Sequence, residues 1–93
     1  MRHGRIDANH REIVAALRAV GCSVQSLADI GHGCADIVVG YHGANYLLEV
    51  KAGKGRLTAD EIEWMQAWRG QYQMVRSVEE ALRAIGHNTD MEP

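Results

Sequence analysis

Two acidic residues and a lysine interrupt the two most apolar segments of the chain. Asp36 precedes an Ile-Val-Val run, and Glu49 and Lys51 lie in a Tyr-Leu-Leu-Glu-Val-Lys run. Residues two apart on a strand share a face and lie about 7 Å apart, so we expect Glu49 and Lys51 on one face. Carboxylates on adjoining strands offer the oxygen ligands that Mg²⁺ prefers. The pattern predicts a cation site formed by Asp36, Glu49 and a strand carbonyl, that of Val50.

Lys51 would add a positive charge beside the two carboxylates. Such an ammonium group can orient an attacking water or help to deprotonate it, and it stabilises charge that develops on a phosphate. The spacing of Glu49 and Lys51 alone is equally typical of a surface ion pair on an edge strand. Glu12 favours the cation site. At ~100° per residue, Asn9 projects into the apolar stripe of the first expected helix, and Glu12 lies at the edge of that stripe. We therefore expect a third carboxylate that leans toward the rest of the domain.

Hydrophobic spacing predicts the elements that position these residues. A first helix is expected over residues 8–20, with Asp7 as its N-cap and Gly21 at the C′ position. Three strands should follow, of which the last two form an antiparallel hairpin: residues 23–29, 36–41 and 46–51.

Two further helices are expected to begin at capping boxes. Thr58 and Glu61 form one such pattern, and Ser77 and Glu80 form the other. A short strand over residues 73–75 separates the two helices. We expect the first of these helices to bury Ile62, Met65 and Trp68.

The resulting order, α-β-β-β-α-β-α, predicts an α/β fold. A strand-helix-strand crossover normally leaves its two strands parallel, and the preceding strands form a meander, so the sheet should be mixed and flanked by helices. A chain of 93 residues has room for a single domain. We expect that domain over residues 1–86, followed by a flexible tail over residues 87–93.

Composition limits the possible functions. No apolar run approaches the ~20 residues that span a bilayer, and the start resembles no signal peptide, so we expect a cytoplasmic protein. The two cysteines are expected to be free thiols, since no CxxC or HxxxH spacing predicts zinc. The net charge is −2, but residues 1–56 carry seven basic against five acidic side chains. A polyanionic ligand is therefore compatible with the first part of the chain.

The same residues resemble a known family. Asp36, followed thirteen positions later by Glu49-Val50-Lys51, resembles the D…(E/D)xK signature of the PD-(D/E)XK nuclease superfamily. Two longer stretches, around Asp36 and at 75–82, are similar to the VRR-NUC group, in particular to its small stand-alone members, which are often phage-encoded. The resemblance covers nearly the whole chain and implies a restriction-endonuclease-like core.

The resemblance also implies an activity and roles for individual residues. It implies a DNA endonuclease that depends on Mg²⁺, with Mn²⁺ as a substitute. Asp36 and Glu49 would be metal ligands and Lys51 the catalytic lysine. Glu12 matches the first-helix acid of Holliday-junction-resolvase-like members, and it would complete the metal shell or bind a second cation.

Two positions depart from the family pattern. Ala35 stands where proline is usual, which loosens the turn but removes no ligand. Glu61 stands where many members carry glutamine early in the second helix. Because Glu61 already has a capping role available, a catalytic part for it is the less favoured interpretation.

The sequence therefore predicts cleavage of phosphodiester bonds in branched, Holliday-junction-like DNA by a homodimer, in a bacterial or phage-infected cell. We expect the DNA backbone to be contacted by Arg5, Asn9, Lys54 and Arg56. The alternative is a catalytically silent subunit with a nuclease fold that binds nucleic acid or serves in assembly. An RNA-processing endonuclease would use the same site. The intact set of acids and lysine favours an enzyme.

Overall fold

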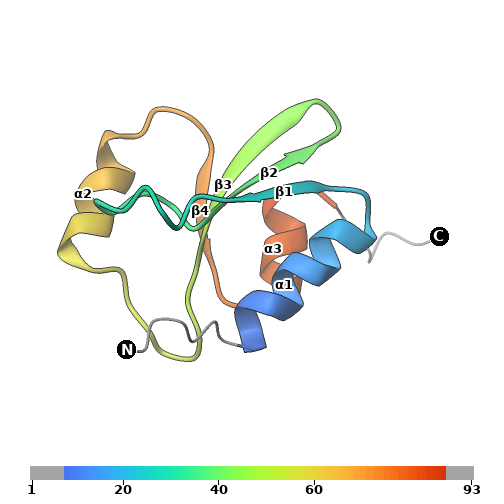
Figure 1. Ribbon diagram of the computed structural model, residues 1–93, viewed down its shortest axis with the longest axis horizontal. Helices are drawn as coiled ribbons and strands as arrows, with labels where there is room; N and C mark the ends of the chain where they lie inside the picture. Colours follow the sequence, from blue (N-terminus) through green and yellow to red (C-terminus); the bar gives the residue numbers. More distant parts are fainter. Residues whose placement is uncertain (1–7, 88–93) are drawn as a thin grey trace.

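A computed structural model describes residues 8–87 of the chain, which form a mixed four-stranded sheet and three helices (Figure 1). In chain order the elements are α1 (Ala8–Ala19), β1 (Ser23–Ser26), β2 (Ile37–Tyr41), β3 (Ala44–Val50), α2 (Ala59–Ala67), β4 (Tyr72–Val75) and α3 (Val78–Ala84). This order confirms the one that the sequence predicts. No helix within residues 8–87 has the length and apolar character needed to cross a bilayer.

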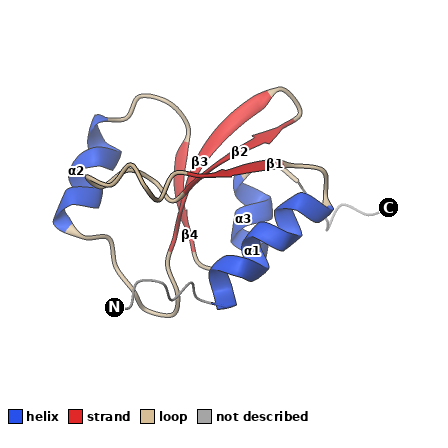
Figure 2. Cartoon of the chain, viewed as in Figure 1, coloured by secondary structure: helices blue, strands red, loops and turns tan. Residues whose placement is uncertain are grey.

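The strands follow the order β1-β2-β3-β4 across the sheet (Figure 2). The first three form an antiparallel meander, in which Ile37 of β2 pairs with Leu48 of β3. The chain then crosses through α2, and β4 pairs with β3 in parallel, Glu49 opposite Met74. Both the central hairpin and the parallel crossover were predicted, and both are confirmed.

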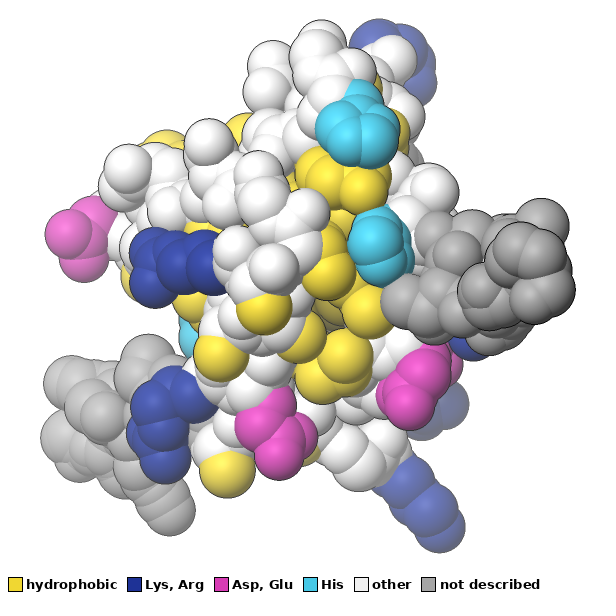
Figure 3. Space-filling model, turned by 90° about the vertical axis from the view of Figure 1, so that its right-hand side faces the viewer, with side chains coloured by type: hydrophobic (Ala, Val, Ile, Leu, Met, Phe, Trp, Pro, Cys, Tyr) yellow, Lys and Arg dark blue, Asp and Glu magenta, His cyan; other side chains and the backbone are white. Residues whose placement is uncertain are grey.

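One face of the sheet carries the hydrophobic core. Helices α1 and α3 contact each other and lie on the same side of the sheet, while α2 stands apart on the opposite side (Figure 1). Period-two alternation directs every second strand residue toward α1 and α3. The buried cluster consists of Ile13, Leu17, Cys22, Ile37, Val39, Leu48, Val75, Ala81 and Ile85. Figure 3 shows the side of the molecule away from α2, where hydrophobic side chains reach the surface between scattered acidic and basic ones.

The other face of the sheet is only partly covered. The register places Val38, Leu47 and Tyr72 in one row across β2, β3 and β4, on the same face as Glu49. Helix α2 has no fully buried side chain; Ile62 is 40% exposed and Trp68 is 43% exposed. The expectation that α2 buries an apolar face is therefore wrong.

The incomplete cover has a local cause. Helix α2 ends at Ala67, and Trp68 is its C-cap residue with an extended backbone. The Trp68 ring stacks on the Trp64 ring, with 4.9 Å between the ring centroids. A hollow of about 530 Å³ remains between Trp68 and the sheet, lined partly by Val38 and Leu47. Asn45 of β3 also lines this hollow, whereas Glu49, further along the same face, is buried.

Side-chain caps explain where helices α2 and α3 begin. Thr58 and Glu61 form the predicted capping box, with both side-chain-to-backbone hydrogen bonds present. Ser77 caps α3 by accepting from the Glu80 N–H, but the Glu80 carboxylate accepts from the Arg76 N–H at 2.8 Å instead of from Ser77. The second capping box is therefore wrong in one of its two bonds, because Glu80 reaches one residue further back.

Two remaining expectations concern the ends of the domain. The predicted N-cap Asp7 lies outside the described residues, whereas Gly21 has the left-handed φ of +98° expected after α1. His87, which was expected in the tail, packs against the domain: its N–H donates to the Leu82 carbonyl at 2.9 Å, and its Nδ1 lies 2.8 Å from the Tyr41 hydroxyl.

Candidate active site

Asp36 and Glu49 lie side by side where β2 begins and β3 ends. The Asp36 N–H donates to the Leu48 carbonyl at 3.1 Å, which continues the ladder between the two strands. The Asp36 carboxylate in turn accepts a hydrogen bond of 2.8 Å from the Val50 N–H. Backbone pairing thus fixes the Asp36 carboxylate beside the end of β3, as the hairpin register predicts.

Glu49 is the buried charged residue of the described chain, with 2% of its surface exposed. Its Oε2 lies 3.5 Å from the Lys51 Nζ, while its Oε1 is buried and has no hydrogen-bond partner within residues 8–87. Burial, followed by the negative charges of Asp36 and Glu61, raises the pKa of Glu49 to about 8. Burial also raises the pKa of Asp36, against the Val50 hydrogen bond and the charges of His10 and Lys51.

Lys51 joins the two strands to helix α2. Its ammonium group lies 2.9 Å from the Glu61 Oε1 in addition to its contact with Glu49. Burial lowers the pKa of Lys51, but the hydrogen bonds and charges of Glu61 and Glu49 outweigh it, and the net shift is upward. Lys51 therefore remains an ammonium group at neutral pH.

Glu61 is the third carboxylate of the cluster. Its Oε1 accepts from the Thr58 N–H at 2.9 Å and from Lys51 at the same time. Burial opposes its ionisation, but Lys51 and the Thr58 N–H outweigh that effect and lower the pKa of Glu61. Glu61 therefore forms the predicted cap and also contacts Lys51, while a catalytic part for it stays a hypothesis.

Helix α1 approaches the site through its first turn. The Asn9 side-chain amide donates to the Lys51 carbonyl at 3.3 Å, and the charge of His10 acts on Asp36. Glu12 is exposed to solvent. Within residues 8–87, Lys51 forms ion pairs with Glu49 and Glu61 but not with Glu12. Its expected lean away from solvent is wrong, and its role as a metal ligand stays a prediction.

The predicted DNA contacts fall on three segments. Lys54 and Arg56 are exposed in the loop between β3 and α2. The Arg76 guanidinium donates to the Gly53 carbonyl at 2.8 Å and so holds this loop to the start of α3. Asn9 is half-buried and engaged with the backbone, and Arg5 lies outside the described residues.

Sequence reasoning did not place Tyr72 or Cys34 at the site. The carboxylates of Glu49, Glu61 and Asp36 all act on the Tyr72 hydroxyl, and burial with these charges raises its pKa to about 12. Burial, followed by the Glu49 and Asp36 charges against one backbone hydrogen bond, raises the pKa of the half-buried Cys34 thiol. A strand one residue longer than predicted would have put Tyr72 on the Glu49 face by alternation.

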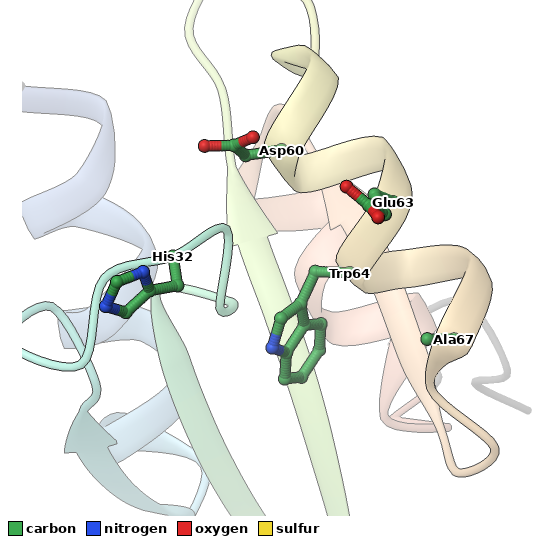
Figure 4. Close-up of a pocket in the computed structure, with 5 residues that line it drawn as sticks. All are labelled: His32, Asp60, Glu63, Trp64 and Ala67. Atoms are coloured by element: carbon green, nitrogen blue, oxygen red, sulfur yellow. The ribbon is translucent and has the colours of Figure 1, made fainter.

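A pocket of about 390 Å³ lies between helix α2 and the loop that precedes β2 (Figure 4). His32 comes from the loop between β1 and β2, and the other lining residues, Asp60, Glu63, Trp64 and Ala67, come from α2. Gly33 in the same loop packs against the Asp60 backbone: a Cβ there would lie 2.4 Å from the Asp60 carbonyl oxygen. The close contact at Gly33 sets the distance between this loop and α2, and hence between Glu61 and β3.

The donor atoms fit a hard divalent cation. Within residues 8–87 no group of three or more His, Cys, Asp or Glu side chains is arranged to hold a metal ion. Mg²⁺, however, is usually bound by one or two carboxylates and completes its shell with waters and substrate oxygens. Asp36 and Glu49 supply two adjacent carboxylates, and Glu49 Oε1 is a buried acceptor that has no donor among the described residues. Such an atom is costly to bury unpaired, and a cation would satisfy it.

Comparisons with protein-family models, with curated proteins and with solved structures give no match for this chain.

Proposed function

We propose that this protein is a Mg²⁺-dependent endonuclease that cleaves phosphodiester bonds in branched DNA. The observation that carries the proposal is the buried Glu49, which lies next to Asp36 and Lys51 and has one carboxylate oxygen unpaired within the part of the chain that the structure describes. A structural ion pair would not need a second, half-buried carboxylate, that of Asp36, whose pKa is also raised. Acidic side chains with shifted pKa values beside a lysine are typical of catalytic and binding sites.

Each residue has a distinct part in the proposed reaction. Asp36 and Glu49 would hold the cation, with the Val50 carbonyl as a further predicted ligand. When bound, the cation supplies Lewis-acid chemistry to a phosphate oxygen. The Lys51 ammonium stabilises negative charge that develops on the phosphate, and Glu61 fixes its position at 2.9 Å.

The substrate class rests on charge and on the resemblance to VRR-NUC nucleases. Lys54 and Arg56 are exposed on the loop that follows the site and are suited to contact phosphates without reading bases. Branched DNA follows from the resemblance, and a homodimer would present two sites to a symmetric junction; both belong to the proposal, as does a cytoplasmic setting.

The test is a cleavage panel with a four-way junction, a flap, a duplex and a single strand, each with Mg²⁺ and with Mn²⁺. We expect the wild-type protein to cut the junction and the variants Asp36→Ala and Lys51→Ala to be inactive. Glu63→Gln is the matched control, because Glu63 is an exposed carboxylate on α2 outside the cluster.

Two results would overturn the proposal. Equal cleavage by wild-type and Asp36→Ala protein would identify a contaminating nuclease. Binding of DNA without cleavage under either cation would instead indicate the catalytically silent subunit.

A further inference from the structure

Two buried polar atoms at the candidate site have no hydrogen-bond partner within the described residues. They are the Glu49 Oε1 and the Tyr72 hydroxyl oxygen, and each exposes less than 1 Å². Most buried polar groups in folded proteins are paired, so two unpaired ones in one small domain call for an explanation. One belongs to a carboxyl group, which only accepts once it is ionised, and the other is a phenol, which can donate.

The two atoms belong to neighbouring side chains on one face of the sheet. Tyr72 pairs with Leu47 across β3 and β4, and Glu49 is the next β3 residue on the same face. Among the charged groups that act on the Tyr72 hydroxyl, the Glu49 carboxylate has the largest effect. The phenol stays protonated at physiological pH, so it is available as a donor.

We propose that Tyr72 is a positioning residue, whose hydroxyl donates to Glu49 when Glu49 holds a divalent cation. This inference rests on the proposed function, since it assigns a partner to one of the proposed ligands. Carboxylates that bind metals are commonly oriented by such hydrogen bonds. Lys51 contacts both Glu61 and the Glu49 Oε2, so Oε1 is the oxygen open to the cation, and its second lone pair can accept from the Tyr72 hydroxyl.

The ring of Tyr72 has a separate, structural contact. It lies 6.1 Å from the Trp64 ring, between centroids, and this contact links β4 to α2. Tyr72→Phe removes the hydroxyl and keeps the ring. Tyr46→Phe is the matched control, because Tyr46 is also half-buried on β3 but packs against the core on the opposite face.

The first measurement is the Kd for Mn²⁺, determined by calorimetry on the full chain. We expect Tyr72→Phe to weaken Mn²⁺ binding about 10-fold, and Tyr46→Phe to leave it unchanged. Wild-type affinity in Tyr72→Phe would overturn the inference and leave the proposed function standing. If the wild-type protein binds neither Mn²⁺ nor Mg²⁺, the proposed function fails, and the inference fails with it.

The second measurement is thermal unfolding in EDTA. Because the hydroxyl is unpaired without a cation, Tyr72→Phe should unfold at the same temperature as the wild-type protein or at a higher one. With Mn²⁺ present, its stabilisation by the ion should be smaller than that of the wild-type protein. A lower unfolding temperature in EDTA would show that the hydroxyl is already paired, and would contradict the inference.

Discussion

The raised pKa of Glu49 predicts that the protein loses stability as the pH rises. Glu49 has an ordinary pKa of 4.5 in the unfolded chain and a pKa of about 8 in the folded protein. A carboxyl group whose pKa is raised on folding contributes stability that is complete below pH 4.5 and is lost as the pH rises toward 8. At 1.36 kcal/mol per pKa unit, the loss between pH 4.5 and pH 7 is about 3 kcal/mol.

Other groups of the cluster do not cancel this effect. The pKa of Asp36 is also raised, which adds to the loss in the same direction. The pKa of Glu61 is lowered, so its contribution is gained as the pH rises to 4.5 and is complete above it. Lys51 is charged throughout the interval.

The perturbation that isolates Glu49 is Glu49→Gln, which keeps the size of the side chain and removes the titration. Urea unfolding in EDTA, followed by tryptophan fluorescence from pH 5 to pH 8, gives the free energy of unfolding of both proteins. We expect similar stabilities at pH 5 and a variant that is more stable by about 3 kcal/mol near pH 7. Parallel pH dependences in the two proteins would refute the reasoning. Addition of Mg²⁺ should flatten the wild-type curve, because a bound cation favours the ionised carboxylate.

Four further substitutions test how the fold and the site are supported. Gly33→Ala should lower the free energy of unfolding by about 2–4 kcal/mol, because it combines a left-handed φ of +84° with a clash against the α2 backbone. Gly31→Ala, with open space around it, should cost only about 1 kcal/mol, and equal losses in a urea titration would contradict this reading. Glu61→Gln should preserve the cap but lower the single-turnover cleavage rate about tenfold, since Lys51 loses its closest partner; an unchanged rate would remove Glu61 from the site. Ser77→Ala should destabilise α3 by about 1 kcal/mol in thermal unfolding, and an unchanged unfolding temperature would show that its cap is dispensable.

Local sequence patterns were sufficient for most of the fold. The Thr58 capping box, the hairpin and the parallel crossover depend on short-range chemistry, and the structure confirms each. The orientation of α2 was not predictable in this way. Ile62 and Trp68 have the spacing of a buried face, but their exposure depends on how far the helix stands from the sheet, which is a tertiary property.

In the candidate site, too, local patterns predicted some residues, whereas others depend on tertiary packing. Asp36, Glu49 and Lys51 were found because they interrupt apolar strands, and strand pairing alone brings them together. Glu61 and Tyr72 reach the cluster from α2 and β4, so their proximity depends on the crossover. The exposed position of Glu12 follows from the rotation of α1 about its axis, which buries Ile13 and Leu17.

The central claim is that Asp36 and Glu49 together bind a divalent cation. Electron paramagnetic resonance of Mn²⁺ titrated into the protein tests it most directly, because free and bound ions give different signals. The account predicts saturable binding by the wild-type protein, weakened by about 100-fold or more in both Asp36→Asn and Glu49→Gln. Absence of binding to the wild-type protein, or wild-type affinity in either variant, would contradict it.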